Sequence, residues 1–145
     1  MPEPMQTYEN HVRYHPPFHF VLTPLLLLNL IWAIVSLIRE PDWSNVQDLL
    51  IAFLLAHISF IARGSALKVQ DRVIRLEEQL RYQRVLPFDL VQRAGALRTG
   101  QIIALRFASD EELPELVQQT LEGKLATAKD IKLAVKNWRG DYLRV

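Results

Sequence analysis

Hydrophobic and polar positions change their spacing along the chain, and the longest unbroken pattern covers residues 44–86. Residues 49–62 include no charged side chain, and from Arg63 onward charged and apolar residues alternate at helical spacing. No proline interrupts the segment before Pro87, which disfavours helical backbone at the residue before it. The pattern therefore predicts one long helix, apolar in its first half and amphipathic in its second.

The start of this segment carries the signals of a helix N-terminus. Ser44 and Gln47 have the spacing of a capping box. At about 1.5 Å per residue, a helix over 46–62 spans roughly 25 Å, slightly less than the ~30 Å hydrocarbon core of a bilayer. We interpret 46–63 as a membrane-spanning helix and 64–86 as an amphipathic stalk.

Four apolar residues of the stalk step by four, three and four, which is the spacing of the two seam positions of a heptad. They are Val69, Val73, Leu76 and Leu80. Because fewer than three heptads fit before the proline, we expect this stripe to pack on the domain that follows. A coiled-coil dimer through the same stripe is the alternative. Glu77 and Arg81 have the spacing of an i,i+4 ion pair on the stalk.

The preceding segment, 18–38, contains no Asp, Glu, Lys or Arg and meets the length requirement for a transmembrane helix. Pro24 lies inside it and should loosen the helix, because proline lacks the amide that bonds to the preceding turn. The link 39–45 is short, so the two spans must be antiparallel neighbours. The side chains expected to make polar contacts inside the membrane are Asn29, His57 and Ser59.

Residues 87–145 show short helical patterns and no alternation of strand length. The segments expected to be helical are 87–96, 99–108, 109–123 and a last one that opens at Thr127 and continues through Trp138. So short a region makes a marginal core alone, and docking on the stalk would help to bury it. The expected fold class is all-α: a two-helix transmembrane hairpin, its second helix extended into a cytoplasmic stalk, and a small helical cytoplasmic domain.

Charge is unevenly distributed, although the formal net charge of the chain is only +1. Residues 63–86 carry six Arg or Lys, whereas the link carries Arg39 alone. Because basic residues favour the cytoplasmic side of a membrane, we expect the polar tail 1–17 and the domain 87–145 in the cytoplasm and the link in the periplasm. Arg13 in the tail agrees with this orientation.

The sequence offers no catalytic motif. It contains no cysteine, which excludes disulfides, thiolate metal sites and cysteine nucleophiles. It has no glycine-rich phosphate loop, nucleophile elbow or HExxH motif. The balanced charge and the lack of a known binding motif argue against nucleic acid. We therefore expect a protein that is not an enzyme and has no nucleic-acid partner.

The chain has four histidines, and histidine is the commonest metal ligand. Three of them step by four, but two prolines interrupt the helix that would align them, so no metal site is expected. These residues are His11, His15 and His19, with Pro16 and Pro17. His57 is a functional candidate because it is ionisable and lies within a predicted span. It could ligate a haem or chlorin or hydrogen-bond Asn29 across the hairpin, and we favour the packing role.

The last predicted helix carries a basic face on the side away from its apolar stripe. Its members are Lys129, Lys132, Lys136 and Arg139. Such a face is most often solvated. Close to a membrane it could contact anionic lipid heads or an acidic partner, at roughly 1 kcal/mol per basic residue.

Four stretches carry a resemblance to a known group of proteins: NHVRYHPPFHF, VQDRVIRLEEQLR, TGQIIALRFASDEELPELV and IKLAVKNWRGDYLRV. Together they resemble an uncharacterised family of small bacterial membrane proteins with two spans and a helical cytoplasmic tail. The resemblance implies a bacterial origin and the two-span architecture. Because that family has no assigned activity, it implies no catalytic residues.

These patterns favour a non-catalytic accessory or scaffold subunit of a larger bacterial inner-membrane complex, without a cofactor. Its partners would be membrane lipids and other integral membrane subunits, with self-association through the stalk as a further option. One alternative is a haem- or chlorin-bearing helper of an electron-transfer or light-harvesting complex through His57. Another is a membrane-surface tether or sensor that uses the basic last helix.

Overall fold

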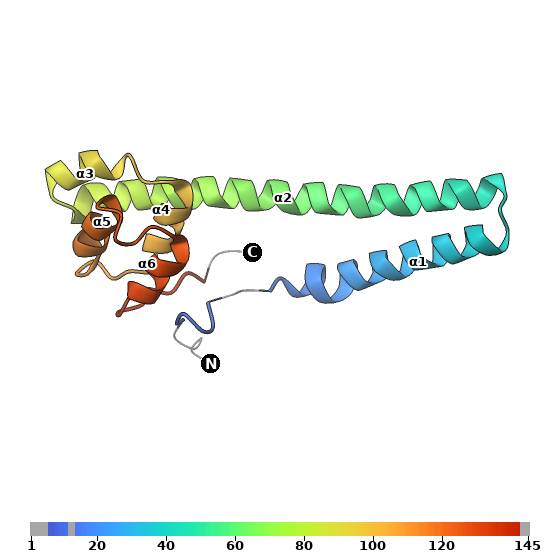
Figure 1. Cartoon of the computed structure of the whole chain (residues 1–145), viewed down its shortest axis with the longest axis horizontal. Helices are drawn as coiled ribbons and strands as arrows, with labels where there is room; N and C mark the ends of the chain where they lie inside the picture. The colour runs from blue at the N-terminus through green and yellow to red at the C-terminus, as the bar shows by residue number, and fades with distance from the viewer. Residues whose placement is uncertain (1–5, 12–13, 143–145) are drawn as a thin grey trace. The chain divides into compact units, whose positions relative to one another are not determined.

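The structure is a computed structural model that describes residues 6–11 and 14–142; Arg13 lies outside these ranges. The helices are η1 (Pro17–Leu22, a π-helix), α1 (Thr23–Arg39), α2 (Trp43–Val85), α3 (Phe88–Ala94), α4 (Thr99–Leu105), α5 (Leu113–Leu121) and α6 (Ala128–Ala134) (Figure 1). No strand occurs in the described ranges, so the predicted all-α fold is confirmed.

The chain forms two compact units. Residues 13–68 form one, called here the hairpin unit, and residues 1–12 with 69–144 form the other, called the domain unit. The long helix α2 contributes to both, as the predicted helix over 44–86 requires. Its start differs in detail, because the carboxylate of Asp42 accepts from the Asn45 amide at 2.8 Å. Asp42 therefore takes the capping role predicted for Ser44.

In the hairpin unit, the helix is loosened just before Pro24, as predicted. The backbone widens here into the π-helix η1. At its end, the Phe18 carbonyl accepts from the Thr23 amide and, at 2.8 Å, from the Thr23 hydroxyl. Proline cannot donate to the carbonyl four residues earlier and clashes with it in a regular α-helix. A wider turn ahead of the proline relieves that conflict.

Two helices are long and apolar enough to cross a membrane: Pro17–Arg39 and Trp43–Val85. Only 6% of the apolar window of each is buried within the protein. Large side chains such as Trp32, Phe53 and Phe60 are exposed. A core helix of a soluble protein has the opposite arrangement, with its apolar side buried.

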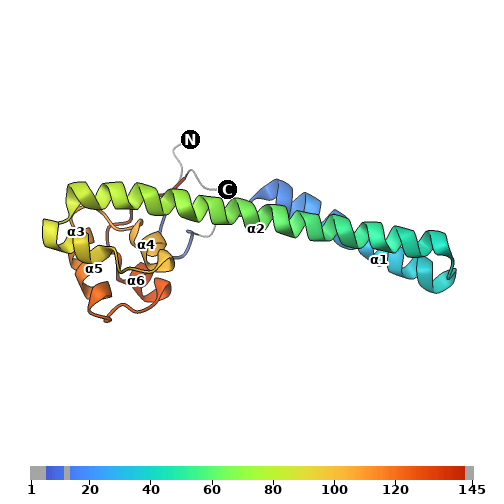
Figure 2. The same ribbon diagram turned by 90° about the horizontal axis from the view of Figure 1, so that it is seen from above.

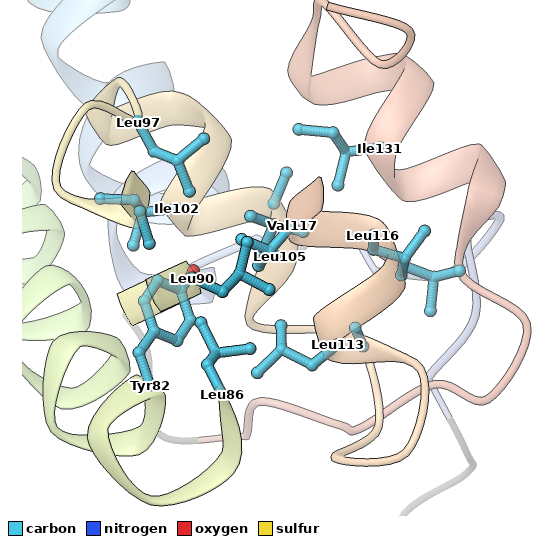
Figure 3. Packing of buried hydrophobic residues seen from close by; sticks show 14 residues of the cluster. Tyr82, Leu86, Leu90, Leu97, Ile102, Leu105, Leu113, Leu116, Val117 and Ile131 are labelled. Carbon is cyan, nitrogen blue, oxygen red and sulfur yellow. The ribbon is translucent and has the colours of Figure 1, made fainter. Parts of the chain in front are cut away.

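In the domain unit, the four short helices α3–α6 lie beside the last turns of α2 and leave one face of that helix uncovered (Figures 1 and 2). Helices of 7 to 9 residues are too short to be stable alone, so tertiary packing must hold them. Figure 3 shows that packing, to which each helix contributes buried side chains. The labelled members are Tyr82, Leu86, Leu90, Leu97, Ile102, Leu105, Leu113, Leu116, Val117 and Ile131.

Local signals explain several helix ends in the domain. The Thr127 hydroxyl accepts from the Asp130 amide at 3.2 Å, and the Asp130 carboxylate accepts from the Thr127 amide at 3.0 Å. This capping box opens α6 at the predicted residue. At the end of α5, Gly123 has a positive φ of 80°, which glycine adopts without strain.

Other boundaries differ from the prediction, and the helix expected over 99–108 ends at Leu105. The segment predicted as a helix from Ser109 becomes helical only at Leu113, with Pro114 in its first turn. The last helix ends at Ala134 rather than continuing through Trp138. Trp138 instead forms an isolated antiparallel bridge with Ala108.

The stripe on α2 does not pack on the domain, so that prediction is wrong. Its four members, Val69, Val73, Leu76 and Leu80, are 47 to 62% exposed. The buried positions here are Arg81 and a series that steps by four and ends just after the helix: Ile74, Glu78, Tyr82 and Leu86. Glu78 is two residues from Leu76 and from Leu80, which at about 100° per residue places it roughly 160° away from both. The domain therefore covers the opposite face of α2.

Candidate functional site

The buried face of α2 carries an ionic cluster centred on Arg81, whose side chain is 4% exposed. Its Nε lies 2.7 Å from Asp110 Oδ1, and its Nη2 donates to the Ala108 carbonyl at 2.7 Å. Its Nη1 donates to Glu78 Oε2 at 3.2 Å. Arg81 therefore ties α2 to the chain segment between α4 and α5. The i,i+4 pair predicted with Glu77 is not formed.

Glu78 is the second buried member of the cluster, with its side chain 5% exposed. Its Oε1 lies 3.3 Å from Arg139 Nη1, so two guanidinium groups face one carboxylate. Burial raises the pKa of Glu78 above its ordinary value of 4.5, and the positive charges of Arg81 and Arg139 oppose that rise. Burial also raises the pKa of the neighbouring Tyr82 hydroxyl, with a smaller contribution from the Glu78 charge.

A second ion pair joins the end of the described chain to Arg106, the residue that follows α4. Arg106, with a side chain that is 5% exposed, contacts Asp141 Oδ2 through Nε at 2.8 Å. The Asp141 backbone is paired in turn with the tail: its amide donates to Gln6 Oε1 at 2.8 Å, and its carbonyl accepts from Gln6 Nε2 at 3.2 Å. Residues separated by most of the chain length are thus held together in the domain unit.

His11 anchors the same tail segment. Its ring centroid lies 5.8 Å from those of Phe107 and Trp138. Its Nδ1 is 2.6 Å from the Tyr8 carbonyl and its Nε2 is 3.1 Å from Lys132 Nζ. These distances fit a neutral imidazole that donates from Nδ1 and accepts at Nε2. The sequence pattern predicts only a polar tail over 1–17 and does not predict this docking.

A cavity of about 600 Å³ lies beside the ionic cluster. Its lining includes Ile74, Glu78, Arg81, Arg84, Arg139 and Tyr142. The arginines on its wall are opposed by Glu77, Glu78 and Asp141, so positive and negative charges nearly balance. The cavity is therefore a polar pocket beside the Arg81 cluster, and its nearly balanced charge does not favour an anion.

The basic face predicted on the last helix is not formed. Since α6 ends at Ala134, Lys136 and Arg139 lie beyond the helix. The Glu112 carboxylate accepts from the amides of Lys136 and Asn137, each at 3.1 Å. These amides therefore do not continue the hydrogen bonds of the helix. Arg139 pairs with Glu78, while Lys132 faces His11; Lys129 remains exposed on α6.

The polar residues of the predicted spans are not brought together as a group. His57 and Asn29 are both exposed and share no hydrogen bond. The His57 ring stacks on Phe53, with centroids 5.9 Å apart. The buried residue of this part of α2 is Ala52, and five residues at about 100° each place His57 roughly 140° from it. The hydrogen bond between His57 and Asn29, which was the favoured packing role of His57, is therefore not formed.

Ser59 is half-buried and lines a mostly apolar cavity of about 420 Å³ in the hairpin unit. The cavity also contacts His15, Phe18 and Arg63. The Arg63 guanidinium lies 5.4 Å from the centre of the Phe18 ring, in a cation–π geometry. Among the residues that the structure describes, no group of three or more His, Asp or Glu side chains could hold a metal ion.

Comparison with known proteins gives one match. A family model described as "Family of unknown function (DUF6526)" matches residues 1–145, which is the whole chain. This agrees with the resemblance of the sequence to an uncharacterised family. No curated protein and no solved structure matches the chain.

Proposed function

The chain belongs to this family of unknown function, and we propose that it is a non-catalytic accessory or scaffold subunit of a protein complex in the bacterial inner membrane. One observation carries the proposal: α2 exposes apolar side chains along both of its segments. The first segment offers a surface of bilayer length, and the second offers the stripe of Val69, Val73, Leu76 and Leu80. The first surface suits lipid, and the second suits another protein.

A membrane environment accounts for the exposed apolar surface of the hairpin unit. Monomeric soluble proteins rarely expose apolar patches beyond a few hundred Å². Both candidate spans are helical, so their backbone amides and carbonyls are bonded within each helix, as the lipid interior requires. The residues between α1 and α2 are few, which suits a hairpin whose ends lie on the same side of the bilayer.

The contacts of the tail support the same topology. Gln6 contacts Asp141 and His11 contacts Phe107, within the domain unit. Both candidate spans lie between the tail and these residues in the sequence. An even number of spans returns the chain to its starting side, so the tail and the domain share a compartment. The six basic residues of 63–86 favour the cytoplasm for that compartment.

The alternative of a membrane-surface tether has lost its main support, because the basic residues do not form one helical face. The domain instead uses Lys132 and Arg139 in its own contacts. A scaffold needs a domain with a stable fold, and the buried Arg81 cluster stabilises the domain unit.

The proposal is tested by native mass analysis of the tagged chain after extraction from host membranes in mild detergent. The expected result is an assembly that contains the 16.8-kDa chain and at least one other integral membrane protein. An unrelated two-span protein with the same tag, expressed at the same level, is the control. Recovery of the chain alone, or of its own multiples alone, in detergent and in native membranes would contradict the proposal.

A further inference from the structure

We propose that Val69, Val73, Leu76 and Leu80 form the seam of a parallel homodimer, so that the partner at this stripe is a second copy of the chain. The inference deepens the proposed function and rests on it in one respect, since the bilayer orients the two copies. The stripe has the four-three-four spacing of alternating d and a positions. Its members are all exposed.

The domain leaves this seam exposed, including Leu80, which lines the cavity beside the ionic cluster and is still 62% exposed. Ile74, Glu78 and Tyr82 are buried against the domain, on the side of α2 away from Leu76 and Leu80. A second helix can therefore approach the stripe without displacing any contact of the domain core. The domain thus buries one face of α2 and leaves the apolar stripe exposed.

The charges beside the seam favour a second copy in parallel orientation. With Val73 at an a position, Arg72 is a g residue and Glu77 is the e residue of the heptad that follows. In a parallel pair, a g residue meets the e residue five positions later on the other helix. Arg72 of each copy thus meets Glu77 of the other, twice by symmetry. Both side chains are exposed, and neither forms an ion pair within the described part of the chain.

An antiparallel pair would lose this match, because it places g residues opposite g residues and e residues opposite e residues. The hairpin excludes that arrangement, since two copies inserted with the same topology have parallel stalks at the same height. The stripe is short for a coiled coil in solution. Confinement in the bilayer raises the effective concentration of the two stalks, so a short seam can suffice.

Disulfide cross-linking of the full chain in native membranes tests the seam. The chain has no cysteine, so each variant carries a single thiol. Leu76→Cys, at a seam position, should form a disulfide-linked dimer under mild oxidation. Arg75→Cys, one residue away and outside the seam, is the matched control and should form several-fold less. Cross-linking of both variants to the same extent would overturn the seam, since random collision would explain it.

Charge reversal tests the identity of the partner. In the Leu76→Cys background, Arg72→Glu should lower the dimer fraction several-fold, and adding Glu77→Arg should restore it. No loss, or no restoration, would overturn the parallel pairing. A Leu76→Cys product with a different protein would overturn the homodimer but support the accessory-subunit proposal. If neither product forms, the homodimer is wrong, and the native mass analysis still decides the proposed function.

Discussion

Replacing Arg81 with leucine should destabilise the domain unit by about 3–5 kcal/mol, because breaking a buried ion pair leaves an uncompensated charge. Glu78 would keep only Arg139, at 3.3 Å and with a side chain that is 55% exposed. The Ala108 carbonyl would also lose its donor, at about 1–3 kcal/mol for a buried polar group left unbonded. Asp110 would add little, because its side chain is 62% exposed and water can replace the arginine.

The double variant Arg81→Leu/Glu78→Gln provides the matched comparison. It removes the unpaired carboxylate together with the guanidinium. Its loss of unfolding free energy should therefore be smaller than the sum of the losses of the two single variants. Urea denaturation of the full chain in detergent measures the stability of each variant. Trp138 fluorescence is the reporter, after Trp32 and Trp43 are changed to phenylalanine. An Arg81→Leu variant within about 0.5 kcal/mol of its parent, or strict additivity in the double variant, would refute the reasoning.

Four further outcomes are expected. Burial raises the pKa of Glu78 in the folded chain, so its contribution to stability is fully present below about pH 4.5 and falls as pH rises through the raised pKa. The stability of the parent relative to Glu78→Gln should therefore fall as pH rises above about 4.5, whereas a rise would show that the arginines outweigh burial. Ile131→Ala, at a fully buried position, should cost about 2–5 kcal/mol in urea denaturation, and a loss below about 1 kcal/mol would contradict the packing. Thr127→Ala should cost about 1 kcal/mol through the lost cap of α6, with Thr127→Ser as the near-neutral control. His57→Ala should leave the visible absorption of the purified assembly unchanged, whereas loss of a Soret or chlorin band would favour the cofactor role.

The elements that depend on local signals were predictable from the sequence. The long helix follows from an uninterrupted pattern between Trp43 and Pro87. The π-helix ahead of Pro24 and the capping box at Thr127 each follow from the chemistry of one or two residues. Such signals act within one or two turns, although the cap predicted at Ser44 is supplied by Asp42 instead.

The face of α2 that packs on the domain was not predictable in the same way. The exposed stripe is made of valine and leucine, whereas the buried one contains Glu78 and Tyr82 and looks polar. The step of four from Ile74 through Glu78, Tyr82 and Leu86 was the available signal. Recognising it requires knowing that Arg81 and Arg139 neutralise the buried carboxylate, which only the tertiary structure supplies.

The end of α6 and the docking of the tail also depend on distant residues. Glu112 holds the amides of Lys136 and Asn137 and so stops a helix that the sequence pattern would continue. Gln6 is hydrogen-bonded to Asp141, which is 135 residues away in the sequence. Neither partner can be identified from spacing, because the chain brings them together only after the domain has folded.

The topology of the hairpin is the central claim, and single-cysteine labelling with an impermeant maleimide on intact cells tests it most directly. The cysteine-free chain allows exposed sites in the tail, the link region and α6 to be compared: Thr7→Cys, Ser44→Cys and Lys129→Cys. We expect Ser44→Cys to react on intact cells, and Thr7→Cys and Lys129→Cys to react only after permeabilisation. Labelling of Thr7→Cys and Lys129→Cys on intact cells, or a difference between these two sites, would contradict the two-span topology with a cytoplasmic tail and domain.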